Sequence, residues 1–77
     1  MSEHAAAELD TRGLLCPLPV IRTQDQVKTM PSGTMLRVVA TDPGTLQDIP
    51  AWCRVHGHEV KRAEEHADEY IFTILVR

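Results

Sequence analysis

The chain has 77 residues, a formal net charge of −3 and a hydrophobic fraction of 43%. This length allows one small domain, and the hydrophobic content is too high for a disordered chain. The acidic balance argues against direct binding of a nucleic acid, because domains that bind nucleic acids carry clustered Lys and Arg.

The sequence predicts neither a membrane span nor a signal peptide. No apolar run is long enough to span a bilayer, and the first residues lack the basic and apolar regions of a signal peptide. We therefore expect a cytoplasmic protein without membrane contact. Residues 1–6 have no strand or helix pattern and are predicted to form a flexible tail, which leaves residues 7–77 as a single domain.

The first half of the domain predicts a strand, a helix and a second strand. Ala7–Asp10 is a short strand, and Gly13 follows as a turn residue. Val20–Met30 carries an apolar helical face and is predicted to end before Pro31, which cannot continue a helix. Thr34–Thr41 alternates in polarity and is the clearest strand.

The second half predicts a helix and two further strands. Pro50 is tolerated only in a first turn, so the regular helix is expected at Ile49–His56, with any turn at Thr45–Asp48 separate from it. Gly57 is predicted as its left-handed cap. The remaining segments, in order, are a weaker strand at His58–Arg62, a charged turn at Glu64–Asp68 and a strand at Tyr70–Val76, whose two apolar faces are typical of a central strand.

This element order, β-α-β-α-β-β, defines the expected fold class. The first strand, helix and second strand form a right-handed crossover, so those two strands are predicted to be parallel. The last two strands are predicted to form a hairpin. We expect an α/β two-layer sandwich with a mixed four-stranded sheet and both helices on one face. The pattern does not predict the order of the strands in the sheet.

Cys16 is the candidate reactive residue, because it directly precedes the first helix. Pro17 fits the first helical position, and Pro19 extends a stiff entry that keeps the sulfur exposed. Unpaired N–H groups at a helix start carry partial positive charge, which lowers the pKa of a nearby thiol from about 8.5. We therefore expect an exposed Cys16 thiolate. A lone cysteine is commonly a small buried hydrophobe, so helix position alone leaves both interpretations open.

The residues around Cys16 form an extended motif. It reads Leu9-Asp10-x-Arg12-Gly13-Leu14-x-Cys16-Pro17-x-Pro19 and resembles the signature of the TusA family of sulfur-carrier proteins, which includes SirA-like and YedF-like members. The resemblance continues to the end of the chain. Its further matches are Gly33, Ala40-Thr41-Asp42-Pro43, Asp48-Ile49-Pro50, Gly57-His58-Glu59 and Tyr70-x-Phe72.

The resemblance implies a function. Family members adopt a two-layer sandwich of this element order. Their motif cysteine, Cys16 here, accepts sulfane sulfur from a cysteine desulfurase or a rhodanese-like donor and passes it to a downstream acceptor protein. Family destinations include tRNA thiolation, molybdenum cofactor assembly and sulfur oxidation. We expect no bound cofactor and a monomer when free, because a carrier must expose its thiol.

Other motif residues have supporting roles in this interpretation. Asp10 and Arg12 are predicted to pair or cap near the loop, as structural rather than catalytic residues. Arg22 is either a partner contact or a solvated surface arginine. The first helix is less basic than in some tRNA-pathway members of the family, which leaves the pathway open.

The second helix and its end carry three residues of types that can bind zinc. Cys53, His56 and His58 are suggestive of zinc, but no CxxC pair or fourth ligand accompanies them, so no metal site is predicted. Cys53 is expected in the core.

Two other functions stay open. The chain is alternatively a non-covalent regulatory or protein-interaction module with a structural Cys16. A dithiol oxidoreductase would require Cys53 close to Cys16. A structural disulfide between them is the poorer interpretation in a compartment that keeps thiols reduced.

Overall fold

The structure is a computed structural model that describes residues 5–77, so most of the predicted tail at residues 1–6 lies outside the described residues. Within the described part, the backbone N–H of Ala6 donates to the Met35 carbonyl at 2.8 Å. In the described part of the chain, no helix has the length and apolar character needed to cross a membrane.

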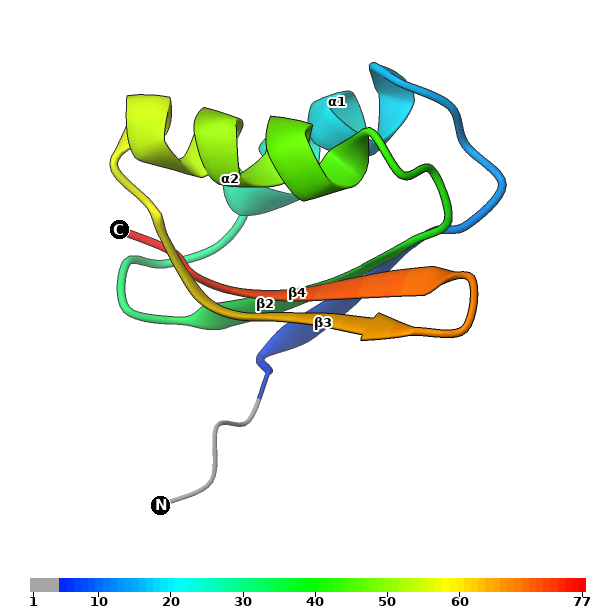
Figure 1. The fold of residues 1–77 in the computed structure, drawn as a ribbon. Coiled ribbons are helices and arrows are strands. Elements are labelled where there is room, and N and C mark those ends of the chain that lie inside the picture. The colour runs from blue at the N-terminus through cyan, green and yellow to red at the C-terminus, as the bar shows by residue number, and fades with distance from the viewer. Residues whose placement is uncertain (1–4) are drawn as a thin grey trace.

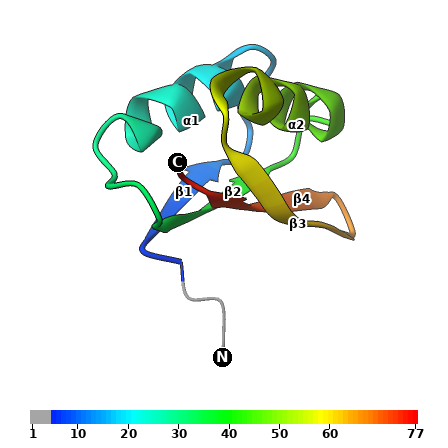
Figure 2. The same cartoon turned by 90° about the vertical axis from the view of Figure 1, so that its left-hand side faces the viewer.

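The six elements follow the predicted order (Figure 1). They are β1 (Ala7–Thr11), α1 (Leu18–Val27), β2 (Met35–Ala40), α2 (Thr45–His56), β3 (Glu59–His66) and β4 (Glu69–Leu75). The four strands form one sheet in the order β1-β2-β4-β3. Strands β1 and β2 are parallel, whereas β4 pairs antiparallel with both of its neighbours. The two helices lie side by side on one face of this sheet (Figure 2), which confirms the predicted two-layer fold.

Strand β4 lies at the centre of the sheet, as its apolar faces predicted. Phe72 and Ile74 are fully buried, and Ile71 and Thr73 on the opposite face are only 7% exposed. The core forms between this strand, β2 and the helices. Its buried members are Leu36, Val38, Ile49, Cys53, Phe72, Ile74 and Val76.

Helix α1 begins two residues earlier than predicted and ends three residues earlier. Its first bond runs from the Ile21 N–H to the Pro17 carbonyl at 3.1 Å, which makes Pro17 the N-cap and places Pro19 in the first turn. The prediction that Pro17 holds the first helical position was therefore wrong. Beyond Val27 the chain continues in turns, where the Met30 N–H still donates to the Val27 carbonyl.

Helix α2 is continuous through Pro50, so the predicted separate turn at Thr45–Asp48 is wrong. Pro50 has no N–H to donate to the Leu46 carbonyl, but the helix continues to His56 despite this missing bond. The helix ends, as predicted, at Gly57, whose φ of 81° lies in the left-handed region.

The charged segment predicted as a turn belongs largely to β3. This strand pairs with β4 as far as His66 opposite Glu69, so the turn shrinks to Ala67 and Asp68. Because β3 is an edge strand, it tolerates charged side chains that solvent can reach. The charge pattern therefore marked an exposed strand rather than a loop.

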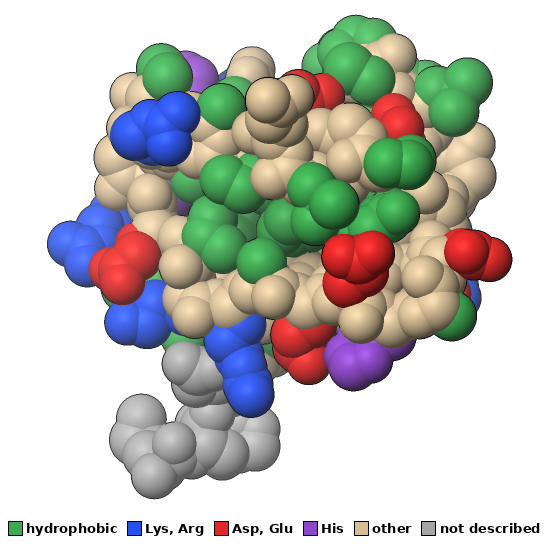
Figure 3. Space-filling view, in the orientation of Figure 1, with side chains coloured by type: hydrophobic (Ala, Val, Ile, Leu, Met, Phe, Trp, Pro, Cys, Tyr) green, Lys and Arg blue, Asp and Glu red, His purple; other side chains and the backbone are tan. Residues whose placement is uncertain are grey.

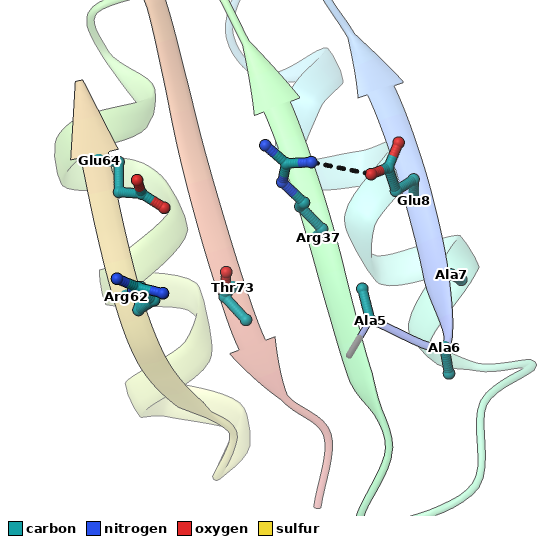
Figure 4. A pocket seen from close by; sticks show the side chains of 8 residues that line it. All are labelled: Ala5, Ala6, Ala7, Glu8, Arg37, Arg62, Glu64 and Thr73. Atoms are coloured by element: carbon teal, nitrogen blue, oxygen red, sulfur yellow. Dashed lines mark hydrogen bonds and ion pairs between the residues drawn. The ribbon is translucent and has the colours of Figure 1, made fainter. Parts of the chain in front are cut away.

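Both helices of residues 5–77 lie on one face of the sheet, which leaves the other face without a helix from this part of the chain. Glu8, Arg37, Thr73 and Arg62 are paired in one row across the four strands. Arg37 donates to Glu8 at 2.9 Å, as Figure 4 shows. This row lines a shallow hollow on the face opposite the helices, and none of its lining residues belongs to the Cys16 motif.

Candidate functional site

Cys16 lies where the loops after β1 and β2 meet. Because these strands are parallel neighbours, their carboxyl ends share one edge of the sheet, and both helices begin there (Figure 1). The loop after β1 turns at Gly13, whose φ of 80° favours glycine. The N–H of Gly13 donates to Thr41 Oγ1 at 2.9 Å, which ties the two loops together.

The backbone of Cys16 is held by Asp42. Its N–H donates to Asp42 Oδ2 at 2.7 Å, and the other oxygen of Asp42 accepts from the Gly44 N–H at 3.1 Å. Gly44 is the N-cap of α2, so the loop that carries the cysteine is fixed to the start of the second helix. The peptide bond between Cys16 and Pro17 is cis. The side chain of Cys16 is exposed, as the sequence predicted.

The Cys16 thiol donates to a carboxylate. Its Sγ lies 3.0 Å from Asp48 Oδ2, in the first turn of α2. This hydrogen bond, followed by desolvation and by the negative charges of Asp48 and Asp42, raises the pKa of Cys16 above its ordinary value. The direction of this shift is opposite to the one predicted from the helix start, because the two carboxylates oppose the partial positive charge of the helix end.

Asp10 and Arg12 form the pair that the motif suggested. Arg12 Nε and Asp10 Oδ1 are 3.0 Å apart, and the Arg12 backbone N–H donates to the same oxygen. Arg12 also reaches Glu69 at 3.3 Å, which joins the loop to β4. The hydrogen bonds from the side chain and the backbone N–H of Arg12, with the charge of Arg12, lower the pKa of Asp10 to about 2. Both side chains are exposed, so the cluster orders the loop rather than stabilising the fold strongly.

The other thiol, Cys53 of α2, is buried. Cys53 is 1% exposed and burial raises its pKa to about 11, in agreement with the predicted core position. His56 and His58 pack against the Trp52 ring, with ring centroids 5.0 and 5.2 Å from it. Among residues 5–77, no three His, Cys, Asp or Glu side chains are arranged to hold a metal ion.

The surface around Cys16 combines apolar and acidic side chains. Leu15 is 72% exposed, Leu18 40% and Leu46 43%, and all three lie near the starts of the helices. Arg22 is also exposed on α1. On the face drawn in Figure 3, Lys and Arg gather at the end where α2 finishes, whereas most acidic side chains lie toward the end where α2 begins.

Comparison with known proteins identifies the family. The model of the family "Sulfurtransferase TusA" matches residues 7–76. This chain belongs to the TusA family.

Its relatives support the assignment. A sulfur carrier protein TusA of Pseudomonas syringae pv. syringae (strain B728a) is 45% identical over 71 residues, which cover 92% of this chain and 82% of the relative. Another of the same name, from Pseudomonas aeruginosa (strain LESB58), is 40% identical over 74 residues, or 96% of this chain and 94% of the relative. The crystal structure of a SirA-like protein from Desulfitobacterium hafniense superposes with a TM-score of 0.78 at 21% identity, over 90% of this chain and 95% of that one. This last likeness supports the fold alone.

Asp42 and Asp48 are the residues at this TusA-family site whose contacts the sequence reading missed. In the sequence they stand out only as parts of the motif matches Ala40-Thr41-Asp42-Pro43 and Asp48-Ile49-Pro50. The available signal was topological, because parallel neighbouring strands place the loop after β2 beside the loop that carries Cys16.

We expect the two thiols to differ widely in alkylation. At neutral pH a mild alkylating agent should modify Cys16 well before the buried Cys53, which reacts only when the core opens. The thiolate is the reactive form, so the Cys16 rate should keep rising with pH beyond 9.0, because its pKa is raised from that value. Mass spectrometry of the modified peptides over a pH series measures both rates. Equal, slow modification of both thiols would instead favour the regulatory module.

Proposed function

We propose that this protein is a sulfur carrier that accepts sulfane sulfur as a persulfide on Cys16 and relays it to a downstream acceptor protein. The observation that carries the proposal is the exposed Cys16 thiol, held at the start of α1 in the motif of a sulfurtransferase family. The relatives named sulfur carrier protein TusA support the same conclusion.

Loading follows the chemistry of thiol–disulfide exchange. Cys16 Sγ, as its thiolate, attacks the outer sulfur of the donor persulfide, and the donor sulfur leaves as a thiolate that takes up the released proton. A raised pKa leaves less thiolate at neutral pH, but it makes each thiolate a better nucleophile. Unloading is the same exchange with an acceptor thiolate, so no external oxidant or reductant is needed.

The loop contacts support this role without taking part in the chemistry. Pro17 caps α1, and Pro19 lies buried in its first turn, where its carbonyl accepts from the Thr23 hydroxyl at 2.8 Å. Gly13 and the Asp10–Arg12 pair hold the loop that leads to Cys16. In this proposal Arg22 is available as a partner contact on the exposed side of α1.

A sulfur carrier requires a donor and an acceptor. We assign the donor to a persulfide-bearing protein, either a cysteine desulfurase or a rhodanese-like enzyme, and the acceptor to a protein thiol. The exposed Leu15 and Leu18 beside Cys16 offer apolar surface for such transient contacts.

Intact-mass analysis tests the proposal. The purified protein is incubated with a cysteine desulfurase and cysteine, or with a rhodanese and thiosulfate. We expect the added mass of one sulfur atom, removed by a reducing thiol. A protein that stays unmodified with both donors, while its Cys16 reacts readily with an alkylating agent, would contradict the carrier function.

A further inference from the structure

Two carboxylates lie beside Cys16: Asp42 accepts from its backbone N–H, and Asp48 accepts from its Sγ. A methyl group placed on Gly44 would lie 3.6 Å from Asp42 Oδ1 and 3.7 Å from Asp48 Oδ2. The same two residues bind the N–H and the Sγ of Cys16. The site is therefore a small acidic niche with the thiol at its edge.

Neither carboxylate is neutralised by a basic side chain. In the described part of the chain, the ion pairs of Asp and Glu involve other residues, and Asp42 and Asp48 form none. Asp42 uses both oxygens on backbone N–H groups. Within residues 5–77, Asp48 Oδ1 makes no hydrogen bond, so this oxygen is left to an outside donor.

This niche opposes the charge that sulfur loading creates. The attacking thiolate is anionic, and so is a persulfide at neutral pH, because a persulfide is a stronger acid than a thiol. A negative charge on the sulfur is disfavoured by the Asp48 carboxylate, whose Oδ2 lies 3.0 Å from Cys16 Sγ. A small donor such as glutathione persulfide brings no net positive charge, whereas a protein donor can place a lysine or an arginine against the carboxylates.

We propose that Asp48, with Asp42, makes the loading of Cys16 depend on a donor protein that brings a cationic side chain to these two carboxylates. The inference rests on the proposed function, which it extends to the choice of donor. The exposed Leu15, Leu18 and Leu46 near this niche would contact apolar side chains around that cation. Asp48 is then the residue that discriminates against small persulfides.

The chemistry is balanced with either kind of donor. The bond between Cys16 Sγ and the outer donor sulfur forms, and the sulfur–sulfur bond in the donor breaks. The thiol proton of Cys16 is taken up by the departing donor thiolate. A cation near Asp48 stabilises the anionic sulfur during this transfer without changing its products.

The test compares two donors on charge variants of the carrier. Asp48→Asn keeps the shape of the side chain and removes its charge, and Asp25→Asn removes an exposed charge elsewhere, on α1. With glutathione persulfide, we expect Asp48→Asn to load about tenfold faster than the wild type, which is the factor for two unit charges 3.0 Å apart in a water-like medium. Asp25→Asn should load at the wild-type rate. With a cysteine desulfurase as the donor, Asp48→Asn should load at the wild-type rate or more slowly.

A conservative variant and the pH profile separate charge from structure. Asp48→Glu keeps a carboxylate at this position and should load from glutathione persulfide as slowly as the wild type. The alkylation profile of Asp48→Asn should shift to lower pH, since Asp48 and Asp42 are the charged groups that act on Cys16.

Two results would overturn the inference while leaving the carrier function intact. One is that Asp48→Asn loads from glutathione persulfide no faster than the wild type. The other is an equal acceleration with both donors. If no form of the protein takes up sulfur from either donor, the carrier function itself fails, and this inference fails with it.

Discussion

Replacing Cys16 with serine is expected to abolish sulfur loading from every donor. A serine hydroxyl does not attack sulfane sulfur, whereas it can still donate to Asp48 as the thiol does. The Cys16 side chain is exposed and outside the core, so the variant should fold normally. Intact-mass analysis after incubation with a cysteine desulfurase and cysteine measures the loss.

The matched control removes the other thiol. Cys53→Ala should still load one sulfur, because Cys53 is 1% exposed and lies in the core. Its free energy of unfolding should fall by about 1 kcal/mol, since a small cavity replaces the sulfur. Sulfur uptake that survives in Cys16→Ser and disappears in Cys53→Ala would reverse the assignment.

Replacing Phe72 with alanine is expected to have the largest effect on stability. Phe72 is fully buried on central strand β4, opposite Val38 of β2 and Ala63 of β3. Truncating a buried phenylalanine costs about 3 to 5 kcal/mol. A domain of 77 residues has a total stability of roughly 4 to 12 kcal/mol. The Phe72→Ala protein should therefore lose a large part of its free energy of unfolding, which urea titration followed by Trp52 fluorescence will measure.

Two comparisons show whether the core causes this loss. Phe72→Leu fills most of the same space and should be destabilised much less than Phe72→Ala. Val55→Ala changes a side chain that is 77% exposed on α2, and its free energy of unfolding should change by less than about 0.5 kcal/mol. A Phe72→Ala protein as stable as Val55→Ala would show that β4 is not the centre of the fold.

The architecture was predictable because its signals are local. Alternating polarity identified β2, two apolar faces identified β4, and Gly57 marked the end of α2 by its left-handed conformation. The right-handed crossover rule then gave the parallel pairing of β1 and β2. The order β1-β2-β4-β3 was not predictable, since it depends on which strand edges pair in three dimensions.

The boundaries failed where tertiary context outweighs local preference. Pro50 indicated a helix start, yet α2 begins at Thr45 and runs through Pro50. The charges of residues 64–66 indicated a turn, yet pairing with β4 holds them in an edge strand.

The site was predictable in its nucleophile but not in its electrostatics. Cys16 follows from its place before α1 and from its motif. The raised pKa of Cys16 could not be predicted in this way, because the hydrogen bond to Asp48 joins residues 32 positions apart in the chain. A prediction based only on the nearby helix end therefore gave the wrong direction for the pKa of Cys16.

The position of the transferred sulfur tests the central claim most directly. After loading from a cysteine desulfurase, the protein is alkylated, digested without reducing agent and analysed by peptide mass spectrometry. We predict an alkylated persulfide on the peptide that contains Cys16, with Cys53 unmodified by sulfur. A persulfide found on Cys53, or on neither cysteine, would contradict the account.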